Sequence, residues 1–140
     1  EERLIIRENL AREFPVAKTI LKPEDIIRAR SVVREVYIDE KIENYILDIV
    51  FATRQPDKFG LSKFTPLIAY GASPRAGINL ALAAKSYAFI RRRGFVVPED
   101  VRSLCADVLR HRIGLTYEAE AENITQDQII AEVLNTVEVP

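Results

Sequence analysis

Two stretches of this chain repeat apolar residues at the spacing of an amphipathic helix, and this pattern constrains the fold most. In the first stretch the apolar positions are Ile42, Tyr45, Ile46, Ile49 and Val50. The second stretch repeats the same i, i+3, i+4, i+7, i+8 spacing with Val101, Leu104, Cys105, Val108 and Leu109. Because a helix completes a turn about every 3.6 residues, each set of five side chains lies on one face. The pattern therefore predicts helices that pack together through these faces.

Start and stop signals divide the chain into about five helices. The predicted starts are Pro23, Asp39, Ser73 with Pro74, Pro98, and the capping box of Thr125 and Gln128. Proline suits the first helical position, and Ser, Asp and Thr side chains accept hydrogen bonds from free helix-start amides. The helix after Pro74 is apolar on nearly all sides, which predicts a place in the middle of the bundle. Three arginines at 91–93 and then Gly94 predict its end.

The remaining segments carry weaker patterns. Residues 1–13 favour a short helix, and residues 14–22 favour a linker. Residues 55–70 contain two prolines and a glycine, and this composition predicts a loop that packs on something through its aromatic residues. Residues 95–97 favour a short extended piece, and the loose alternation over 113–122 favours a short strand or hairpin. The expected fold is mostly α, a bundle of about five helices with short β segments.

Composition narrows the classes of function. The chain has 140 residues and a net charge of -1, which argues against general nucleic-acid binding. No apolar run is long enough to span a bilayer. A single Cys excludes an internal disulfide and favours a reducing compartment such as the cytoplasm. The sequence contains no Met, and we interpret it as a piece of a longer protein.

The chain lacks the motifs of a self-sufficient active site. It contains no G-x-x-x-x-G-K-[ST] phosphate loop, no G-x-G-x-x-G and no G-x-S-x-G. One His and one Cys are too few for a dedicated zinc site. Any catalytic role therefore has to be shared with another domain or subunit.

One segment stands out as a candidate site, residues 71–76, which read G-A-S-P-R-A. Ser73 and Pro74 set the helix start, so Arg75 emerges from the first helical turn. A cation faces the positive end of the helix dipole there, which is unfavourable unless an anion is bound. A helix start that carries a guanidinium suits a phosphate group. The alternative is a surface Arg75 paired with a nearby carboxylate.

Other residues have a functional and a structural interpretation. Arg91, Arg92 and Arg93 suit nucleic-acid contact or a solvated helix end. His111 suits a general base or a structural histidine, and no catalytic partner is visible in the sequence. Cys105 lies on the apolar stripe, which indicates a buried, inert thiol. Arg54 suits contact with a neighbouring subunit or a surface ion pair.

An ordered set of motifs along nearly the whole chain resembles the lid of the MoxR family of AAA+ ATPases, which are related to magnesium-chelatase subunits. The G-A-S-P-R-A segment and the Ala-rich helix after it resemble the centre of that lid. The other matching motifs are E-E-R-L-I-I at 1–6, Y-I with A-T-R between 45 and 54, R-G-F-V-V-P-E-D-V at 93–101 and L-R-H-R-I at 109–113. The set is specific as an ordered series, whereas S-P-R alone would be weak.

The resemblance implies a role and a domain layout. Arg75 corresponds to the family's sensor-2 arginine, which approaches the γ-phosphate of ATP, with Ser73 and Pro74 beside it. ATP and Mg²⁺ would be bound mainly by an AAA+ core of the same polypeptide, with residues 1–22 as the connecting helix and linker and 23–140 as the lid. The lid alone would hydrolyse no ATP, whereas the parent protein would be an ATP hydrolase.

The resemblance also implies partners. MoxR relatives form rings, commonly hexamers, and work as cytoplasmic chaperone-like machines in remodelling or metal insertion, often with von Willebrand factor A-domain proteins. Neither a membrane nor nucleic acid is an expected partner. The alternative from a different class is a stand-alone helical module that binds protein or nucleic acid, with arginines 91–93 as its best feature. A third reading is an assembly domain in which Arg75 makes only a salt bridge.

Three features depart from the family pattern. The stretch at 57–69 is longer and more aromatic than expected. Tyr70 stands where an aliphatic residue is usual, and Arg92 stands where a glycine is common. These departures leave Arg75 untouched.

Overall fold

The computed structural model describes residues 1–10 and 17–140. The chain divides into two compact units, Glu1–Arg30 and Ser31–Pro140. The first unit contains helix α1, Glu2–Asn9, and most of α2, Pro23–Glu35, which starts at the predicted proline with Glu24 and Asp25 in its first turn. The sequence prediction for residues 11–16 lies outside the described part of the chain.

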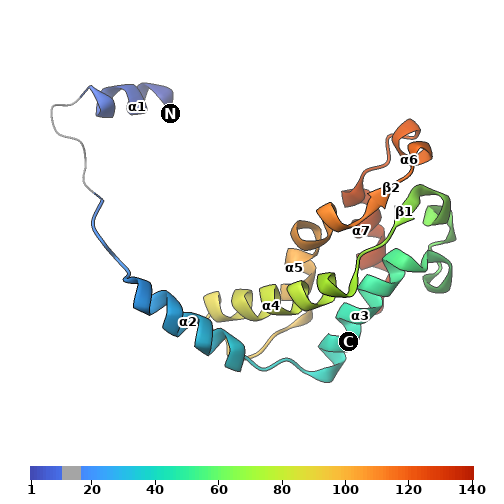
Figure 1. Ribbon diagram of the computed structural model, residues 1–140, viewed down its shortest axis with the longest axis horizontal. Coiled ribbons are helices and arrows are strands. Elements are labelled where there is room, and N and C mark those ends of the chain that lie inside the picture. The colour runs from blue at the N-terminus through green and yellow to red at the C-terminus, as the bar shows by residue number, and fades with distance from the viewer. Residues whose placement is uncertain (11–16) are drawn as a thin grey trace. The chain divides into compact units, whose positions relative to one another are not determined.

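The second unit is built on four helices that share one apolar core (Figure 1). They are α3, Glu40–Arg54; α4, Pro74–Ile90; α5, Pro98–Leu109; and α7, Gln126–Thr136. Helix α4 packs on α5 and α3, and α7 packs on the same two helices. The two apolar stripes identified in the sequence supply buried side chains of α3 and α5, so the prediction of a mostly α bundle is confirmed.

Two predicted helix starts are confirmed in detail. The Asp39 carboxylate accepts a hydrogen bond from the Lys41 amide at 2.9 Å and caps α3. At the start of α7, the Thr125 amide donates to Gln128 Oε1 at 2.7 Å, and the Gln128 amide donates to Thr125 Oγ1 at 3.3 Å. Both arrangements satisfy amides that the first helical turn leaves without a helical partner.

Helix α4 differs from the prediction in its burial. Its buried stripe consists mainly of small residues, namely Ala76, Gly77, Leu80, Ala84 and Ala88. Small side chains allow the backbone of α4 to approach its neighbours closely. Helix α4 lies between α3 and α5, as predicted for a helix in the middle of the bundle, but Ile78, Leu82 and Ile90 on its other sides are exposed. The apolar composition of the helix alone did not show which of its sides are buried.

The end of α4 also differs from the prediction. The helix ends at Ile90, and Arg92 takes the left-handed conformation with φ 58°. The Arg93 amide then donates to the carbonyl of Ala88 at 2.9 Å. The left-handed residue that follows the helix is therefore Arg92 rather than Gly94. A glycine at position 92 would adopt this positive φ without steric cost.

Residues 55–70 are more regular than the predicted loop. They form two 3₁₀ helices, η1 at Pro56–Phe59 and η2 at Ser62–Leu67, followed by strand β1 at Ile68–Tyr70. Gly60 ends η1 with φ 71°, a conformation that favours glycine. Leu61, Phe64 and Leu67 are buried, as the predicted packing requires. The loop prediction was wrong because Pro and Gly mark 3₁₀ turns as well as irregular loops.

The segment 113–122 is only partly extended. Strand β2, Gly114–Leu115, pairs antiparallel with β1, with Ile68 opposite Leu115 and Tyr70 opposite Gly114. A further 3₁₀ turn, η3 at Arg110–Arg112, precedes β2. Helix α6, Tyr117–Ala121, then follows, and its start is capped by Thr116. The prediction of a short strand is confirmed for residues 114–115, whereas the hairpin is wrong because the partner strand comes from the 55–70 segment.

The connection from α4 to α5 is held by a buried ion pair. Arg93 donates to both carboxylate oxygens of Asp100, at 2.8 and 2.5 Å, and the Val97 amide donates to Asp100 Oδ2 at 3.0 Å. In the segment between Arg93 and Asp100, Phe95 forms a parallel β-bridge with Tyr37. This bridge confirms the extended piece predicted at 95–97. Burial by itself would raise the pKa of Asp100, but the hydrogen bonds from Arg93 and Val97 outweigh it and hold that pKa below its ordinary value.

Candidate functional site

The candidate segment, residues 71–76, joins β1 to α4 as predicted. Ser73 takes the N-cap position with extended backbone (φ -77°, ψ 167°), and Pro74 is the first helical residue. The Ser73 side chain makes no capping hydrogen bond, which differs from the expectation for a serine at this position. Pro74 has no N–H and the Ala76 amide donates to the Ser73 carbonyl at 2.8 Å, so the Ser73 hydroxyl and the Arg75 amide are the donors of this turn without a partner among the described residues.

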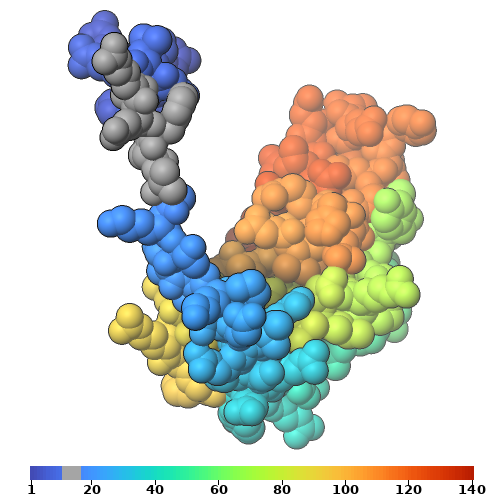
Figure 2. Space-filling model, turned by 60° about the vertical axis from the view of Figure 1, so that its left-hand side comes forward, coloured from blue at the N-terminus to red at the C-terminus, as the bar shows by residue number. Residues whose placement is uncertain are grey.

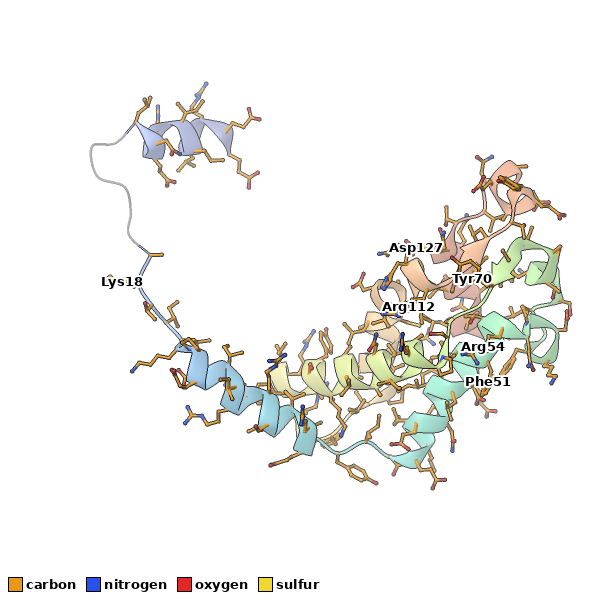
Figure 3. The ribbon with its side chains drawn as sticks, viewed as in Figure 1. Lys18, Phe51, Arg54, Tyr70, Arg112 and Asp127 are labelled. Atoms are coloured by element: carbon orange, nitrogen blue, oxygen red, sulfur yellow. The ribbon has the colours of Figure 1, made fainter. Side chains whose placement is uncertain are left out.

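The turn before α4 is bound to the last turn of α3. Thr53 Oγ1 accepts a hydrogen bond from the Ala72 amide at 2.9 Å and donates to the Val50 carbonyl at 2.7 Å. Arg54 Nε donates to the carbonyl oxygen of Ala72. We call these contacts of Thr53 and Arg54 with Ala72 the Ala72 anchor. Figure 3 shows Arg54 beside Phe51 at the end of α3, and its Cζ atom lies 5.7 Å from the centre of the Phe51 ring.

Gly71 allows this close approach. A Cβ atom at Gly71 would lie 2.3 Å from the carbonyl oxygen of Thr53 and 2.8 Å from the Cα of Arg54. Both are backbone atoms, which cannot swing aside as a flexible side chain would. The glycine is therefore required here by contact with α3.

Sequence reasoning missed the role of Thr53 and left Arg54 open between a subunit contact and a surface ion pair. In the described part of the chain Arg54 makes no salt bridge. Its Nε instead donates to the Ala72 carbonyl. The A-T-R motif at 52–54 was the only signal in the sequence, and it does not show which backbone group the side chains bind. That partner is set by how α3 and α4 pack.

Arg75 lies on the exposed side of the first turn of α4. Within the described residues it makes no hydrogen bond or salt bridge, so the same-chain ion pair considered from the sequence does not form. The start of α4 also differs from the other described α-helices, all of which carry an acidic residue in the first turn, whereas α4 carries none. The arrangement concentrates positive potential at one helix start.

A groove between α3 and α4 adjoins this helix start. It has a volume of about 390 Å³, and its walls include the exposed side chains of Leu47, Phe51 and Ile78 together with Arg54 and Pro74. The space-filling view in Figure 2 shows one side of this unit, with α4 in yellow-green beside the orange segment that follows α5. The groove is largely apolar, so it suits a protein surface more than a highly charged ligand.

The arginines at 91–93 do not act as one basic patch. Arg91 donates to the Tyr87 hydroxyl at 2.7 Å and lies over the Tyr87 ring, whereas Arg93 is bound to Asp100. Of the three, only Arg92 has no hydrogen-bond or ion-pair partner among the described residues, and it is exposed. Within the described residues only Arg93 is therefore neutralised by a carboxylate, and Arg91 and Arg92 remain exposed cations.

The remaining candidate residues, Cys105 and His111, differ in burial. Burial raises the pKa of the Cys105 thiol to about 12, so the thiol stays protonated at neutral pH and the prediction of an inert, buried Cys is confirmed. His111 is exposed in the 3₁₀ turn between α5 and β2. Among residues 1–10 and 17–140, no group of three or more His, Cys, Asp or Glu residues could hold a metal ion. Within the same residues, no helix is both long and apolar enough to cross a membrane.

Comparison with known proteins gives consistent matches. The family model described as "AAA lid domain" matches residues 64–133. The chain is 40% identical over 126 residues to Chaperone MoxR1 of Mycobacterium tuberculosis, covering 90% of this chain and 33% of that protein. It is 35% identical over 105 residues to protein MoxR of Paracoccus denitrificans, covering 71% of this chain and 31% of that protein. The chain thus spans about a third of the length of these relatives.

A solved structure matches as well. The crystal structure of a protein of Cytophaga hutchinsonii described as an ATPase superposes with a TM-score of 0.94 at 41% sequence identity. The match covers 99% of this chain and 42% of that chain. The helical arrangement described above is therefore that of a segment within a longer chain of the Cytophaga protein.

Proposed function

Because this chain belongs to the AAA lid domain family, in the lid of MoxR-type AAA+ ATPases, we propose that it completes the ATP site of a longer parent protein through Arg75. In this proposal Arg75 is the sensor-2 arginine and contacts the γ-phosphate. Ser73 and Pro74 form the helix start from which it projects. The lid alone is not expected to hydrolyse ATP, whereas the parent acts as an ATP hydrolase.

The observation that carries the proposal is the electrostatic character of the α4 start. This helix start has an exposed cation, a serine hydroxyl without a capping bond and no acidic residue in its first turn. Each feature is unfavourable for an isolated helix, because the positive end of the helix dipole is left uncompensated. Each becomes favourable when a phosphate binds, since helix-start amides and a guanidinium both donate to anionic oxygens.

Arg75 supports two functions in this position. A guanidinium beside a transferring phosphoryl group stabilises the charge on its equatorial oxygens in the transition state. The same contact makes the position of the lid depend on whether the γ-phosphate is present. The described residues offer no cluster of metal ligands, so we assign the binding of Mg²⁺ and most of the nucleotide to the AAA+ core of the parent.

The groove between α3 and α4 supports the proposed partner. If Arg75 contacts a nucleotide, the surface around it also has to contact the protein that binds this nucleotide. The exposed side chains of Leu47, Phe51 and Ile78 lie in the groove next to Pro74, where an apolar surface of an AAA+ core would cover them. We propose that the parent assembles as a ring, a hexamer, in which cores and lids meet.

The wider role follows from the relatives. The name of the Mycobacterium relative identifies that protein as a chaperone. By similarity we propose that the parent of this lid performs chaperone-like remodelling or metal insertion in the cytoplasm, with von Willebrand factor A-domain proteins as partners. The single free, buried Cys105 is compatible with a reducing compartment.

The test of the proposal is Arg75→Ala in the full-length ATPase. Loss of one preorganised donor at a charged transition state reduces kcat on the order of 10²-fold to 10³-fold. Steady-state ATP hydrolysis measures this effect. Lys58→Ala serves as the matched control, because it removes another exposed cation whose side chain has no partner among the described residues. Equal turnover in wild type and Arg75→Ala would remove Arg75 from the mechanism.

A further inference from the structure

The start of α4 is held by side chains of α3 rather than by its own cap. The Ser73 hydroxyl makes no capping bond, whereas both backbone polar groups of the preceding residue, Ala72, are bound by the Ala72 anchor. Thr53 is fully buried, so water does not compete for its hydrogen bond to the Ala72 amide. The direction in which α4 leaves the turn is therefore determined by α3.

The anchor lies close to Arg75 along the chain. Only Ser73 and Pro74 separate Ala72 from Arg75, and the proline ring restricts φ to about -65°. Few backbone torsions therefore remain free between the anchored residue and the arginine. Gly71 adds to this restraint, because its backbone lies in contact with the carbonyl of Thr53.

Arg54 also carries a local cost. Its Nη2 is buried and has no hydrogen-bond partner among the described residues. A buried donor without a partner lowers the contribution of this side chain to the stability of the folded state. Local losses of stability of this kind are typical of functional sites, where a residue holds other groups in a required position.

We propose that Thr53 and Arg54 are positioning residues, which aim Arg75 by holding Ala72. This inference rests on the proposed function of Arg75 and adds the residues that determine its direction. The efficiency of a guanidinium at a reacting phosphate depends on its placement within about 1 Å. Changes in the anchor are therefore expected to act on turnover without any contact between the anchor and ATP.

Three variants of the full-length ATPase test the anchor. Thr53→Val keeps the shape of the side chain and removes the hydroxyl, Thr53→Ser keeps the hydroxyl, and Arg54→Lys keeps the charge and removes the Nε donor. We expect Thr53→Val and Arg54→Lys to reduce kcat on the order of tenfold with a smaller change in KM, because the misplaced group acts in the transition state. Thr53→Ser is expected to keep a kcat close to that of the wild type, because it retains the hydroxyl. Equal losses in Thr53→Ser and Thr53→Val would overturn the role of the hydroxyl.

A double-mutant cycle separates positioning from general destabilisation. If the anchor acts through Arg75, Thr53→Val and Arg54→Lys cause no further loss of turnover in the Arg75→Ala background. Full additivity would overturn the inference. Normal turnover in Arg75→Ala would refute the proposed function itself, whereas impaired Arg75→Ala with normal anchor variants would refute only the positioning role.

A second readout needs no nucleotide. In this 140-residue chain, the backbone amide signals of Ser73, Arg75 and Ala76 are expected to shift in Thr53→Val and Arg54→Lys when measured by nuclear magnetic resonance. Arg102→Lys is the matched control, because Arg102 also donates to a backbone carbonyl, that of Leu134, between α5 and α7. Unchanged signals in both anchor variants would overturn the inference. Arg54→Lys alters a partly exposed side chain, so it keeps the test available if Thr53→Val does not fold.

Discussion

The two ends of helix α4 are held in different ways. At its C-terminal end, Arg93 and Asp100 form a bidentate ion pair, and Asp100 also accepts from the Val97 amide. The Arg93 side chain is 28% exposed and that of Asp100 only 3%. At the N-terminal end, backbone groups of Ala72 are bound by α3, while Arg75 remains exposed without a partner in the described residues.

The difference separates a structural end from an end that is available for binding. At the C-terminal end the charge of Arg93 is neutralised by Asp100, and this ion pair contributes to the stability of the fold, whereas Arg91 and Arg92 remain exposed. At the N-terminal end Arg75 and the Ser73 hydroxyl have no partner among the described residues, so this end is suited to interaction with another molecule. Changes at the two ends are therefore expected to affect different measurements.

Asp100→Asn is expected to have the largest effect on stability. The substitution removes the charge that pairs with Arg93, which is partly exposed, and the loss of hydrogen bonds to the buried Asp100 carboxylate costs up to about 3 kcal/mol. Denaturant unfolding of the chain measures the change in free energy. Asp127→Asn is the matched control, because Asp127 pairs with Arg110 at 2.7 Å with both side chains about half exposed. Such an exposed pair contributes little to stability, and equal losses in the two variants would contradict the assignment of the Arg93–Asp100 pair as structural.

Gly71→Ala is expected to have the next largest effect. Its Cβ would lie 2.3 Å from the carbonyl oxygen of Thr53, so the backbone has to move. Overpacking of this kind costs about 2 kcal/mol. Gly94→Ala is the control, because a Cβ at Gly94 meets nothing within 4 Å and the residue does not have positive φ. Equal unfolding midpoints for wild type and Gly71→Ala would show that the N-terminal turn is loosely held.

A smaller change in the free energy of unfolding is expected when pH is lowered, through Asp100 at the C-terminal end. The pKa of Asp100 in the folded chain lies below its ordinary value, because the bonds from Arg93 and Val97 outweigh the effect of burial. The unfolded chain therefore binds a proton more readily, with a pKa of about 3.9. The contribution of the carboxylate is present above that value and is lost as pH falls through the lower folded pKa. Unfolding measured across this window should show a weaker pH dependence in Asp100→Asn than in wild type.

Arg75→Ala is expected to have the smallest effect on stability. The side chain is exposed and makes no contact that holds the fold, so the free energy of unfolding should change by less than about 0.5 kcal/mol. Removal of a cation from the positive end of the helix dipole can even stabilise the chain. The same denaturant measurement checks this expectation. A loss as large as that of Asp100→Asn would remove the contrast between the two ends of α4.

Local patterns in the sequence predicted much of the fold. The stripes of α3 and α5 have the helical period, and the caps at Asp39 and Thr125 use bonds within three residues of the cap. Such features need no knowledge of the rest of the chain. The position of Arg75 on the first turn of α4 followed from the Ser-Pro start in the same way.

Other features could not be predicted because they depend on distant partners. Strand β1 is extended because Ile68 and Tyr70 pair with residues 114–115, far along the chain. Arg92 ends α4 although Gly94 appeared the better candidate, since the Arg93 amide bonds back to Ala88 at that position. No spacing rule connects these residues in advance.

The sequence by itself determined the helical period, most helix starts and the residue that carries the candidate site, because these depend on contacts within one or two turns. Only the tertiary structure decided that Thr53 and Arg54 hold Ala72 and that Arg93 is bound by Asp100. The physical reason is that a hydrogen bond between two elements forms only after the apolar core has brought them together. The direction of Arg75 is also decided by the tertiary structure, because α3 holds the turn from which α4 begins.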